Sequence, residues 1–391
     1  MTRLKYIIEQ LCPDGVEYKT LGEIATISRG GSFQKKHFVN SGVPCIHYGQ
    51  IYTKYSLFAN TTFTFISDEV AKKQRFAQPN DIVMAVTSEN IEDVCKCVVW
   101  LGDTPVAVSG HSAIIHHTQN AKYLAYYFHS SMFFTQKRKI AQGTKVIEVS
   151  PDKLNRITIP IPPLEVQTEI VRILDKFTEL TTELTTELTN RKKQYEYYSR
   201  QLFADAKNTQ STTLEQISHN YDSQRKPVTS NKRTAGIYPY YGASGIVDYV
   251  DDYIFDGDYL LISEDGANLL ARNTPIAFSV SGKTWINNHA HILKFDNYHT
   301  RRYVEIYLNS IDLSPYITGA AQPKLNQKNL NKIEIPLPPI EEQQRIVAIL
   351  DRFDALCNDI SEGLPAEIEA RQKQYEYYRD KLLTFKELKK V

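Results

Sequence analysis

The chain has 391 residues, of which 42% are hydrophobic and 23% charged, as is typical of a globular protein with more than one core. No apolar run approaches the roughly 18 residues of a membrane span, and the N-terminus lacks a signal-peptide plan, so we expect a cytoplasmic protein without membrane contact. Five cysteines without metal-ligand spacing indicate reduced thiols, and a net charge of +1 does not by itself indicate nucleic-acid binding.

Residues 1–19 are expected to form an N-terminal arm before a first variable block, residues 20–158. This block holds fifteen Lys and Arg residues against ten Asp and Glu residues, a net charge of +5. Short apolar runs of β type occur at 82–86 and 97–101, and a helical stretch near 121–140 closes the block. The pattern predicts a compact mixed α/β domain with the more plainly basic surface of the chain.

Residues 159–207 are expected to form a long helical segment. The diproline at 162–163 opens it, and apolar residues then recur at helical spacing for about forty residues without Gly or Pro. Three consecutive TELT tetrapeptides occupy 178–189, and two interpretations of them remain open. They form either a low-complexity helical face or a spacer of variable length, since each tetrapeptide adds ~6 Å and ~40° of rotation to a helix.

A second variable block, residues 208–334, follows this segment. Between residues 212 and 334 it holds twelve Lys and Arg residues against thirteen Asp and Glu residues, a net charge of −1. We expect strands at LEQI (214–217) and YLLIS (259–263), and a helix near 300–312. This block is therefore predicted to be a second mixed α/β domain, and any contact with DNA must come from local basic faces.

Residues 335–391 form a second helical segment that repeats the first. IPLPPIEEQQRIVAILDRF at 335–353 matches IPIPPLEVQTEIVRILDKF at an offset of 176 residues, and KQYEYY recurs at an offset of 180. Gly363 and Pro365 predict a kink or short break near 361–365, with Pro365 starting the next segment. The blocks repeat more weakly, so the chain is a tandem duplication of a variable block and a long helix. The expected fold is two α/β (α+β) domains separated by two long helices.

Motifs for catalysis or metal binding are scarce. Gly282-Lys283-Thr284 resembles the end of a phosphate-binding loop, but the first glycine of that motif is missing and a β-type run follows where a helix is needed. The histidines fit no metal-ligand spacing and are typical of core or strand-face positions. The sequence argues against an enzyme and predicts no metal or cofactor on this chain.

Basic clusters recur at one position of the two blocks. Arg29–His37 is a glycine-containing loop after LGEI, and residues 224–233 follow the predicted LEQI strand. Arg, Lys, Gln and Asn side chains hold phosphates or read base edges, so the clusters are either solvated faces or loops that face a DNA groove. The candidate DNA-binding residues are Arg29, Lys35, Lys36, Lys72, Lys73, Arg75, Gln224, Arg225, Lys226, Lys232, Arg233 and Tyr241.

The order of blocks, the motif IPxPPxExQ…RIxxILDxF and the motif KQYEYY resemble the specificity subunit of type I restriction-modification enzymes. In this sequence the motifs are Ile159–Phe177, Ile335–Phe353, Lys193–Tyr198 and Lys373–Tyr378. The TELT array resembles the spacer repeats of one branch of that family. The resemblance covers nearly the whole chain and is specific in the helices.

The resemblance implies two target-recognition domains that each read half of a bipartite, asymmetric DNA site. The helices would pack antiparallel with pseudo-twofold symmetry, and the N-terminal arm would lie beside the C-terminal helix end. Two modification subunits carrying S-adenosylmethionine would dock on the helices and methylate a flipped adenine, and restriction subunits using ATP and Mg²⁺ would join them. The helix residues implied in docking or helix packing are Phe177, Tyr195, Tyr198, Phe353, Tyr375 and Tyr378.

A competing interpretation is a scaffold whose two α/β modules bind proteins, which predicts no salt-dependent affinity for DNA. A catalytic methyltransferase or nuclease subunit is a third interpretation, but its motifs are missing. If Arg225 contacts a base, Arg225→Ala is expected to relax recognition of one half-site only. Equal weakening on all sequences would identify a phosphate contact.

Overall fold

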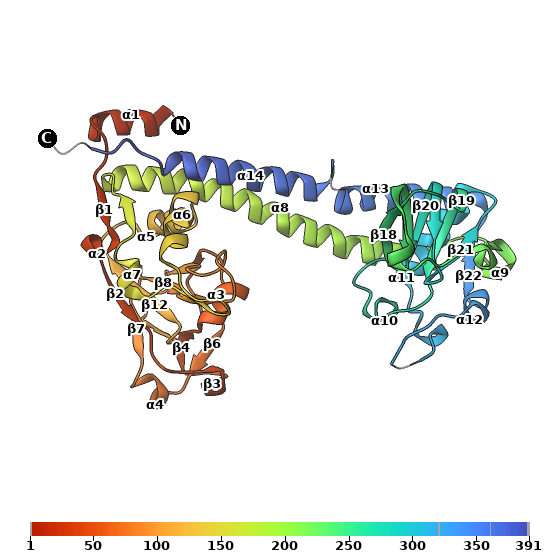
Figure 1. Ribbon diagram of the computed structural model, residues 1–391, viewed down its shortest axis with the longest axis horizontal. Coiled ribbons are helices and arrows are strands. Elements are labelled where there is room, and N and C mark those ends of the chain that lie inside the picture. Colours follow the sequence, from red (N-terminus) through yellow and green to blue (C-terminus); the bar gives the residue numbers. More distant parts are fainter. Residues whose placement is uncertain (1, 320, 360, 389–391) are drawn as a thin grey trace. The chain divides into compact units, whose positions relative to one another are not determined.

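The computed structural model describes residues 2–319, 321–359 and 361–388, and the chain divides into two compact units. Unit 1 comprises Met1–Leu184 and Ile368–Val391, and unit 2 comprises Thr185–Glu367. Both boundaries fall within helices, namely α8 (Leu164–Ala204) and α14 (Leu364–Leu382), so each of these helices contributes to both units (Figure 1). Across the described residues, no helix is long and apolar enough to cross a membrane.

Unit 1 contains two five-stranded sheets. The strand order of the first is β2 (Ala25–Arg29), β12 (Ser112–His117), β8 (Ile82–Ala85), β10 (Cys97–Trp100) and β5 (Phe58–Ala59). The order of the second is β3 (Phe38–Val39), β6 (Thr64–Ile66), β4 (Val43–Ile46), β11 (Val106–Val108) and β7 (Arg75–Ala77). Aliphatic side chains from both sheets, such as Ile46, Val83 and Val98, share one buried cluster that holds the sheets together.

The remaining elements of unit 1 are short. Two antiparallel pairs join β1 (Tyr18–Thr20) to β14 (Thr158–Pro160) and β9 (Thr87–Ser88) to β13 (Ile147–Glu148). The helices before α8 are α1 (Thr2–Leu11), α2 (Leu21–Ile24), η1 (Lys35–His37), α3 (Tyr48–Thr53), α4 (Asp68–Ala71), α5 (Ala121–Phe128), α6 (Ser131–Ile140) and α7 (Pro151–Leu154).

Unit 2 contains one six-stranded sheet. Its order is β16 (His219–Asn220), β21 (Ala290–Lys294), β19 (Phe255–Ser263), β20 (Ala277–Ile286), β17 (Ala235–Gly242) and β18 (Gly245–Val250). A separate pair joins β15 (Gln210–Thr213) to β22 (Glu334–Leu337). The helices are α9 (Leu214–Ile217), η2 (Asp222–Gln224), η3 (Ser230–Lys232), α10 (Asn268–Ala271), α11 (Tyr298–Ser310), η4 (Ser314–Tyr316), α12 (Gln327–Asn331) and α13 (Ile340–Asn358).

The main core of each unit joins its sheet to a closing helix and to the long helices. In unit 1, Met84 of β8, Leu124 of α5, Leu174 of α8 and Leu382 of α14 belong to one buried cluster. The corresponding cluster of unit 2 includes Leu260 of β19, Val304 of α11, Leu350 of α13 and Phe203 of α8. The start of one long helix and the end of the other therefore share each core.

Ring contacts show that the long helices pack antiparallel within each unit, as expected. In unit 1, Phe177 near the start of α8 stacks on Tyr378 near the end of α14, with ring centroids 5.4 Å apart. In unit 2, Phe353 of α13 lies 6.1 Å from Tyr198 near the end of α8. Because these are equivalent residues of the duplicated motifs, each helix start is paired with the other helix's end.

The N-terminal arm lies beside the C-terminal helix end, as the resemblance implied (Figure 1). Val16 pairs with Glu387 in a parallel bridge, in which its N–H donates to Lys386 O at 2.8 Å and its carbonyl accepts from Leu388 N at 2.9 Å. The neighbouring Gly15 has φ of +127°, and a Cβ there would lie 2.7 Å from Lys386 O. Glycine is therefore required for this close approach.

Most predicted elements are confirmed, with one correction. The expected strands near 82–86, 97–101 and 259–263 are β8, β10 and β19, and the break after α13 ends at Leu364, one residue before Pro365. LEQI, expected as a strand, is instead the single-turn helix α9. Thr213 N donates to Gln216 Oε1 at 2.9 Å, so the Thr-x-x-Gln sequence forms a capping box that favours a helical turn.

Candidate nucleic-acid interface

The two basic loops leave equivalent strands. The loop of unit 1 follows β2, which pairs antiparallel with β12, and the loop of unit 2 follows β16, which pairs antiparallel with β21. The position inferred from the repeat of LGEI and LEQI is therefore the same topological position in both units. Each loop leaves the edge strand of its sheet and turns towards the start of the neighbouring strand.

In unit 1 the loop lines a hollow of about 650 Å³. The hollow is lined by Arg29, residues 31–36, His47, Tyr48 and residues 109–111. Glycines allow the loop to cross the segment before β12, because a Cβ on Gly30 would lie 2.2 Å from Ser109 O. Gly31 N donates to Val108 O at 2.7 Å and fixes that crossing. The sequence thus places a narrow glycine turn where three cations approach one cavity.

The cations of this loop have two different environments. Arg29 is half-exposed, and its guanidinium donates to Gly110 O at 2.8 Å and pairs with Glu148 at 3.0 Å. Lys35 and Lys36 are exposed, and neither forms an ion pair within the part of the chain that the structure describes. Arg29 therefore holds the loop, while the two lysines point charge towards solvent.

The second cluster of unit 1 lies beside the first. Arg75 Nη1 donates to Arg29 O at 3.2 Å, and Gln74 approaches the backbone of Gly31. Lys72 and Lys73 are exposed at the end of α4. The fold thus brings together two basic clusters that are about forty residues apart in the sequence.

Aromatic and imidazole rings form the wall of the same hollow. The rings of His47 and Tyr48 lie 4.7 Å apart, and Tyr48 lies 4.8 Å from His111. Burial lowers the pKa of His47, and the nearby positive charge of Lys35 lowers it further, so this ring is neutral at pH 7. Gly49 N donates to His47 Nδ1 at 3.2 Å, which leaves Nε2 as the protonated nitrogen. The hollow is thus lined by the rings of these three residues beside the two lysines.

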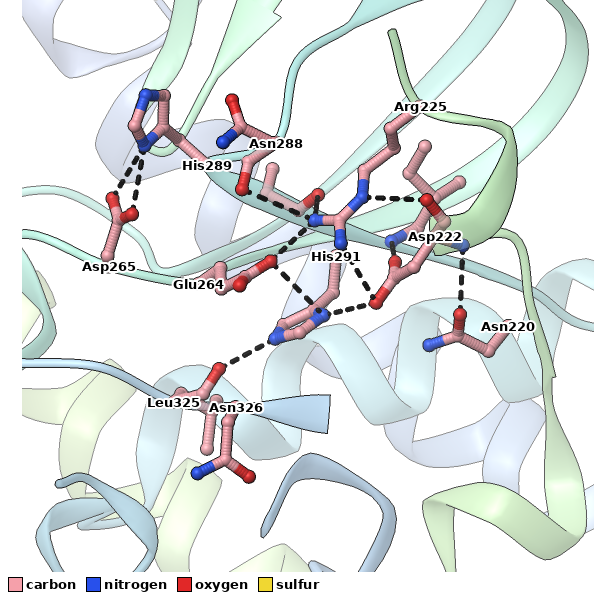
Figure 2. Close-up of polar contacts among 12 residues, drawn as sticks. Asn220, Asp222, Arg225, Glu264, Asp265, Asn288, His289, His291, Leu325 and Asn326 are labelled. Carbon is pink, nitrogen blue, oxygen red and sulfur yellow. Dashed lines mark hydrogen bonds and ion pairs between the residues drawn. The ribbon is translucent and has the colours of Figure 1, made fainter. Parts of the chain in front are cut away.

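In unit 2, Arg225 is held inside its loop, as Figure 2 shows. Its side chain is 14% exposed and pairs with Glu264 at 2.5 Å. The guanidinium also donates to Ala290 O at 2.9 Å and to Asp222 O at 3.0 Å. Arg225 therefore anchors the loop to β21 and to the end of β19, and its charge is already used within the unit.

His291 completes this buried network. Its Nδ1 lies 2.6 Å from Asp222 Oδ2 and its Nε2 lies 2.7 Å from Leu325 O, so both ring nitrogens face acceptors (Figure 2). Burial raises the pKa of Asp222, but the hydrogen bond and charge of His291 outweigh it and the pKa is lowered. The pKa of Glu264 is likewise lowered, because Arg225 and Lys324 offset its burial.

The three side chains Asp222, Glu264 and His291 have ligand atoms within 4.8 Å of one another, an arrangement that could hold a metal ion. Lys324 Nζ lies 3.0 Å from Glu264 Oε1, and Arg225 takes the other oxygen. Because two cations already neutralise the carboxylates and both His291 nitrogens are engaged, the donor set does not fit an open metal site.

The other candidate residues of unit 2 fall into two groups, as in unit 1: side chains bonded within the unit and exposed side chains. Arg233 is mostly buried, donates to Val228 O at 3.0 Å and lies 4.2 Å over the ring of Tyr240. Tyr241 is half-buried, and its carbonyl accepts from Asn287 N. The exposed candidates of this loop are Gln224, Lys226 and Lys232. Sequence reasoning grouped these residues because their types are alike, whereas the structure separates anchors from exposed side chains.

Of the helix residues expected in docking or packing, Tyr198 is 44% exposed, and the others are buried or partly buried. Phe177 and Phe353 form the ring contacts described above, Tyr375 is buried at 7% exposure, and Tyr195 is half-buried. The remaining tyrosines of the two motifs, Tyr197 and Tyr377, are 57% and 60% exposed. Both belong to KQYEYY, and helical periodicity separates them from their neighbours, so the motif contains an inward and an outward tyrosine.

Comparison with known proteins matches both units. The family model for the type I restriction modification DNA specificity domain covers residues 13–193 and 207–370. A Haemophilus influenzae protein named as a type I restriction enzyme specificity subunit is 40% identical over 182 residues, 46% of this chain and 47% of that protein. The EcoR124I/EcoR124II specificity subunit of Escherichia coli is 36% identical over 256 residues, 59% of this chain and 63% of that protein.

The alignments thus span about half and just under two thirds of these two relatives. A solved structure concerning complex assembly and conformational transition of the type I R-M system covers 95% of this chain and 98% of its own, with a TM-score of 0.64 at 14% identity. That likeness supports the whole fold. With two copies of the matching domain over most of its length, the chain belongs to the type I restriction-modification DNA specificity family.

Proposed function

We propose that this chain is the non-catalytic DNA-recognition subunit of a type I restriction-modification complex. Each unit reads one half of a bipartite, asymmetric site, and the long helices set the spacing between the halves. The observation that carries this proposal is the pair of basic loops, which differ in sequence but leave equivalent strands of two duplicated units. Two recognition units of different sequence, held by duplicated helices, suit a DNA site whose two halves differ in sequence.

The exposed side chains of the loops make the DNA contacts. In unit 1 the lysines of the loop and of α4 contact phosphates and base edges beside the hollow that His47, Tyr48 and His111 line. In unit 2 the contacting residues are Gln224, Lys226 and Lys232. Arg29, Arg225 and Arg233 keep the loops in shape, and Arg75 and Tyr241 border them. The chain works in the cytoplasm, where its DNA substrate lies.

Two copies of a modification subunit dock on the long helices. This follows from exposed residues that are identical in the two KQYEYY motifs: Lys193, Gln194, Glu196 and Tyr197 in α8, and Lys373, Gln374, Glu376 and Tyr377 in α14. A partner present twice requires the same surface twice. The partner carries S-adenosylmethionine and methylates adenine, and restriction subunits that use ATP and Mg²⁺ complete the complex.

The first test maps methylation in cells that express this chain with its modification subunit. We expect one interrupted adenine-methylated motif with two unlike halves and a fixed spacer. Binding of the purified complex to DNA with that motif should weaken steeply with salt, because lysines displace counterions from phosphates. If no methylated motif appears and random duplexes are not bound, the proposal fails and a protein-binding scaffold takes its place.

A further inference from the structure

The closing helix of each unit is joined to the start of a long helix by one repeated set of contacts, which we call the joint. In unit 1 the joint connects α5 to β14 and α8. In unit 2 it connects α11 to β22 and α13. Three contacts form the joint, and each joins a residue of the variable block to a residue of the helical segment. From unit 1 to unit 2, the block residues are offset by about 180 positions and the helical-segment residues by 176.

The first pair uses the glutamine of the IPxPPxExQ motif. Gln167 is fully buried, donates to Pro162 O at 2.8 Å and accepts from Asn120 N at 3.0 Å. In unit 2, Gln343 donates to Pro338 O at 2.7 Å and accepts from Thr300 Oγ1 at 2.8 Å. Each amide thus ties the diproline turn to the first turn of the closing helix.

The second pair is a tyrosine that donates to a proline carbonyl. Tyr123 Oη donates to Pro160 O at 2.9 Å, and Tyr303 Oη donates to Pro336 O at 2.6 Å. Both tyrosines are fully buried. Each therefore fixes the distance between its closing helix and the strand that precedes the long helix.

The third pair is an ion pair with the aspartate of the ILDxF motif. Lys122 Nζ lies 2.7 Å from Asp175 Oδ2, and Arg302 Nε lies 2.7 Å from Asp351 Oδ1. All four side chains are partly buried, at 18% to 35% exposure. In unit 1 the same carboxylate accepts from Tyr126 Oη at 2.7 Å, so its direction is fixed from two sides.

These contacts fix the orientation of the closing helix relative to the long helix more than they add to the strength of its packing. Apolar burial between the closing helix and the long helix is non-directional and tolerates rotation. A buried amide with both ends bonded, a tyrosine aimed at one carbonyl and an ion pair are satisfied in a single orientation. The pairs recur in both units although the surrounding blocks have little sequence in common, which points to a shared geometric requirement.

We propose that the joint residues are positioning residues that fix the direction in which each recognition unit leaves its helix. Through this, they hold the spacer of the DNA site to one length. The inference rests on the proposed function, and it concerns residues that do not touch DNA. In B-DNA one base pair turns ~35° and rises ~3.4 Å, so a modest rotation at the joint is enough to admit a neighbouring spacer.

The test compares variants of the full complex by methylation mapping and sorts methylated sites by spacer length. Asp351→Asn removes one charge of the ion pair, and Tyr303→Phe removes one hydroxyl. For each variant we expect methylation at spacers one base pair longer or shorter to rise at least about tenfold relative to the native spacer, with unchanged half-sites.

The matched control is Glu342→Gln. Glu342 lies on the same helix and forms an ion pair of 2.7 Å with Arg345 outside the joint, so this variant should keep the single spacer. A variant with lower thermal stability but an unchanged spacer distribution would overturn the inference and leave the joint a purely structural role. Altered half-site bases would also overturn it, by making the residue a recognition residue.

Tyr303→Phe keeps the test decisive if Asp351→Asn fails to assemble, because it removes a single buried oxygen. A wild-type complex that methylates no bipartite motif would refute the proposed function itself. A wild-type complex with a fixed spacer, combined with variants that keep that spacer, would refute the joint alone.

Discussion

Arginines and lysines have different places in the two basic loops. The planar guanidinium of Arg225 satisfies two carbonyls and a carboxylate at once, and that of Arg29 does the same for Gly110 O and Glu148. A compact ammonium cannot match this set of directions. Lysines at 35, 36, 226 and 232 remain exposed and carry the charge available to a polyanion.

This division predicts opposite effects for adjacent residues. Arg225→Met should destabilise unit 2 by about 2–4 kcal/mol, because the Ala290 carbonyl and one Glu264 oxygen lose their donor. Lys226→Met should change stability by less than about 0.5 kcal/mol but weaken DNA binding and lower its salt dependence by about one counterion. Urea unfolding and binding titrations at several salt concentrations measure both effects. An Arg225→Met variant of normal stability that loses the specificity for one half-site would restore Arg225 as a base-reading residue.

At the scale of elements, the KQYEYY motif places tyrosines on two different faces of one helix. Tyr375 packs inward on Tyr126 at 6.3 Å and Tyr378 stacks on Phe177, whereas Tyr377 between them faces solvent. Residues two positions apart on a helix lie on different faces, so tyrosines of the same motif have different environments. The inward residues explain helix packing, and the outward residue is the one on which the proposed docking rests.

The docking proposal makes a stoichiometric prediction for the helices. Tyr197→Ala and Tyr377→Ala should each reduce the number of modification subunits bound per chain from two to one, and the double variant should bind none. An exposed aromatic anchor is worth at least about 2 kcal/mol at such an interface, roughly a thirtyfold loss of affinity. Native mass spectrometry counts the subunits directly.

Tyr6→Ala is the control for this experiment, because Tyr6 on α1 is 63% exposed and lies outside the two KQYEYY motifs. It should leave two subunits bound. Retention of both subunits by the double variant would move the docking surface elsewhere on the chain.

At the scale of the whole molecule, the TELT repeats occupy the boundary between the two units. Residues 178–189 lie within α8, and the boundary falls between Leu184 and Thr185. Leu180, Leu184 and Leu188 are partly buried. The position suits the proposed spacer, since a length change here alters the helix at the boundary of the two units and leaves the sheets of both intact.

Deletion of one TELT is therefore expected to shorten the spacer of the methylated motif. The helix would lose ~6 Å of length and ~40° of rotation. The rotation corresponds to one base pair of B-DNA, and the length to nearly two. Both half-sites should be unchanged, and the mapping described above measures the spacer. An unchanged spacer would leave DNA recognition by the two units standing and would show that the TELT repeats do not set the spacer length.

Patterns in the sequence were sufficient for the duplication and the long helices, but not for the strand order of the sheets. The offsets of 176 and 180 revealed the duplication, the absence of Gly and Pro predicted α8, and Gly363 with Pro365 predicted the break before α14. Period and turn chemistry act over a few residues, so a sequence can be interpreted at that range. LEQI was the exception, because its capping box was taken for part of a β-type run.

The tertiary structure decided what each side chain does. Arg225 meets Glu264 and Ala290 from 39 and 65 positions away, and Gln343 meets Thr300 from 43. Nothing near Arg225 in the sequence distinguishes it from the exposed Lys226. The sequence by itself determined the duplicated frame and its family, through local periodicity and repeated motifs. Only long-range contacts distinguished the anchoring arginines from the exposed side chains, and the inward from the outward tyrosines, because burial and hydrogen-bond partners are properties of the folded chain.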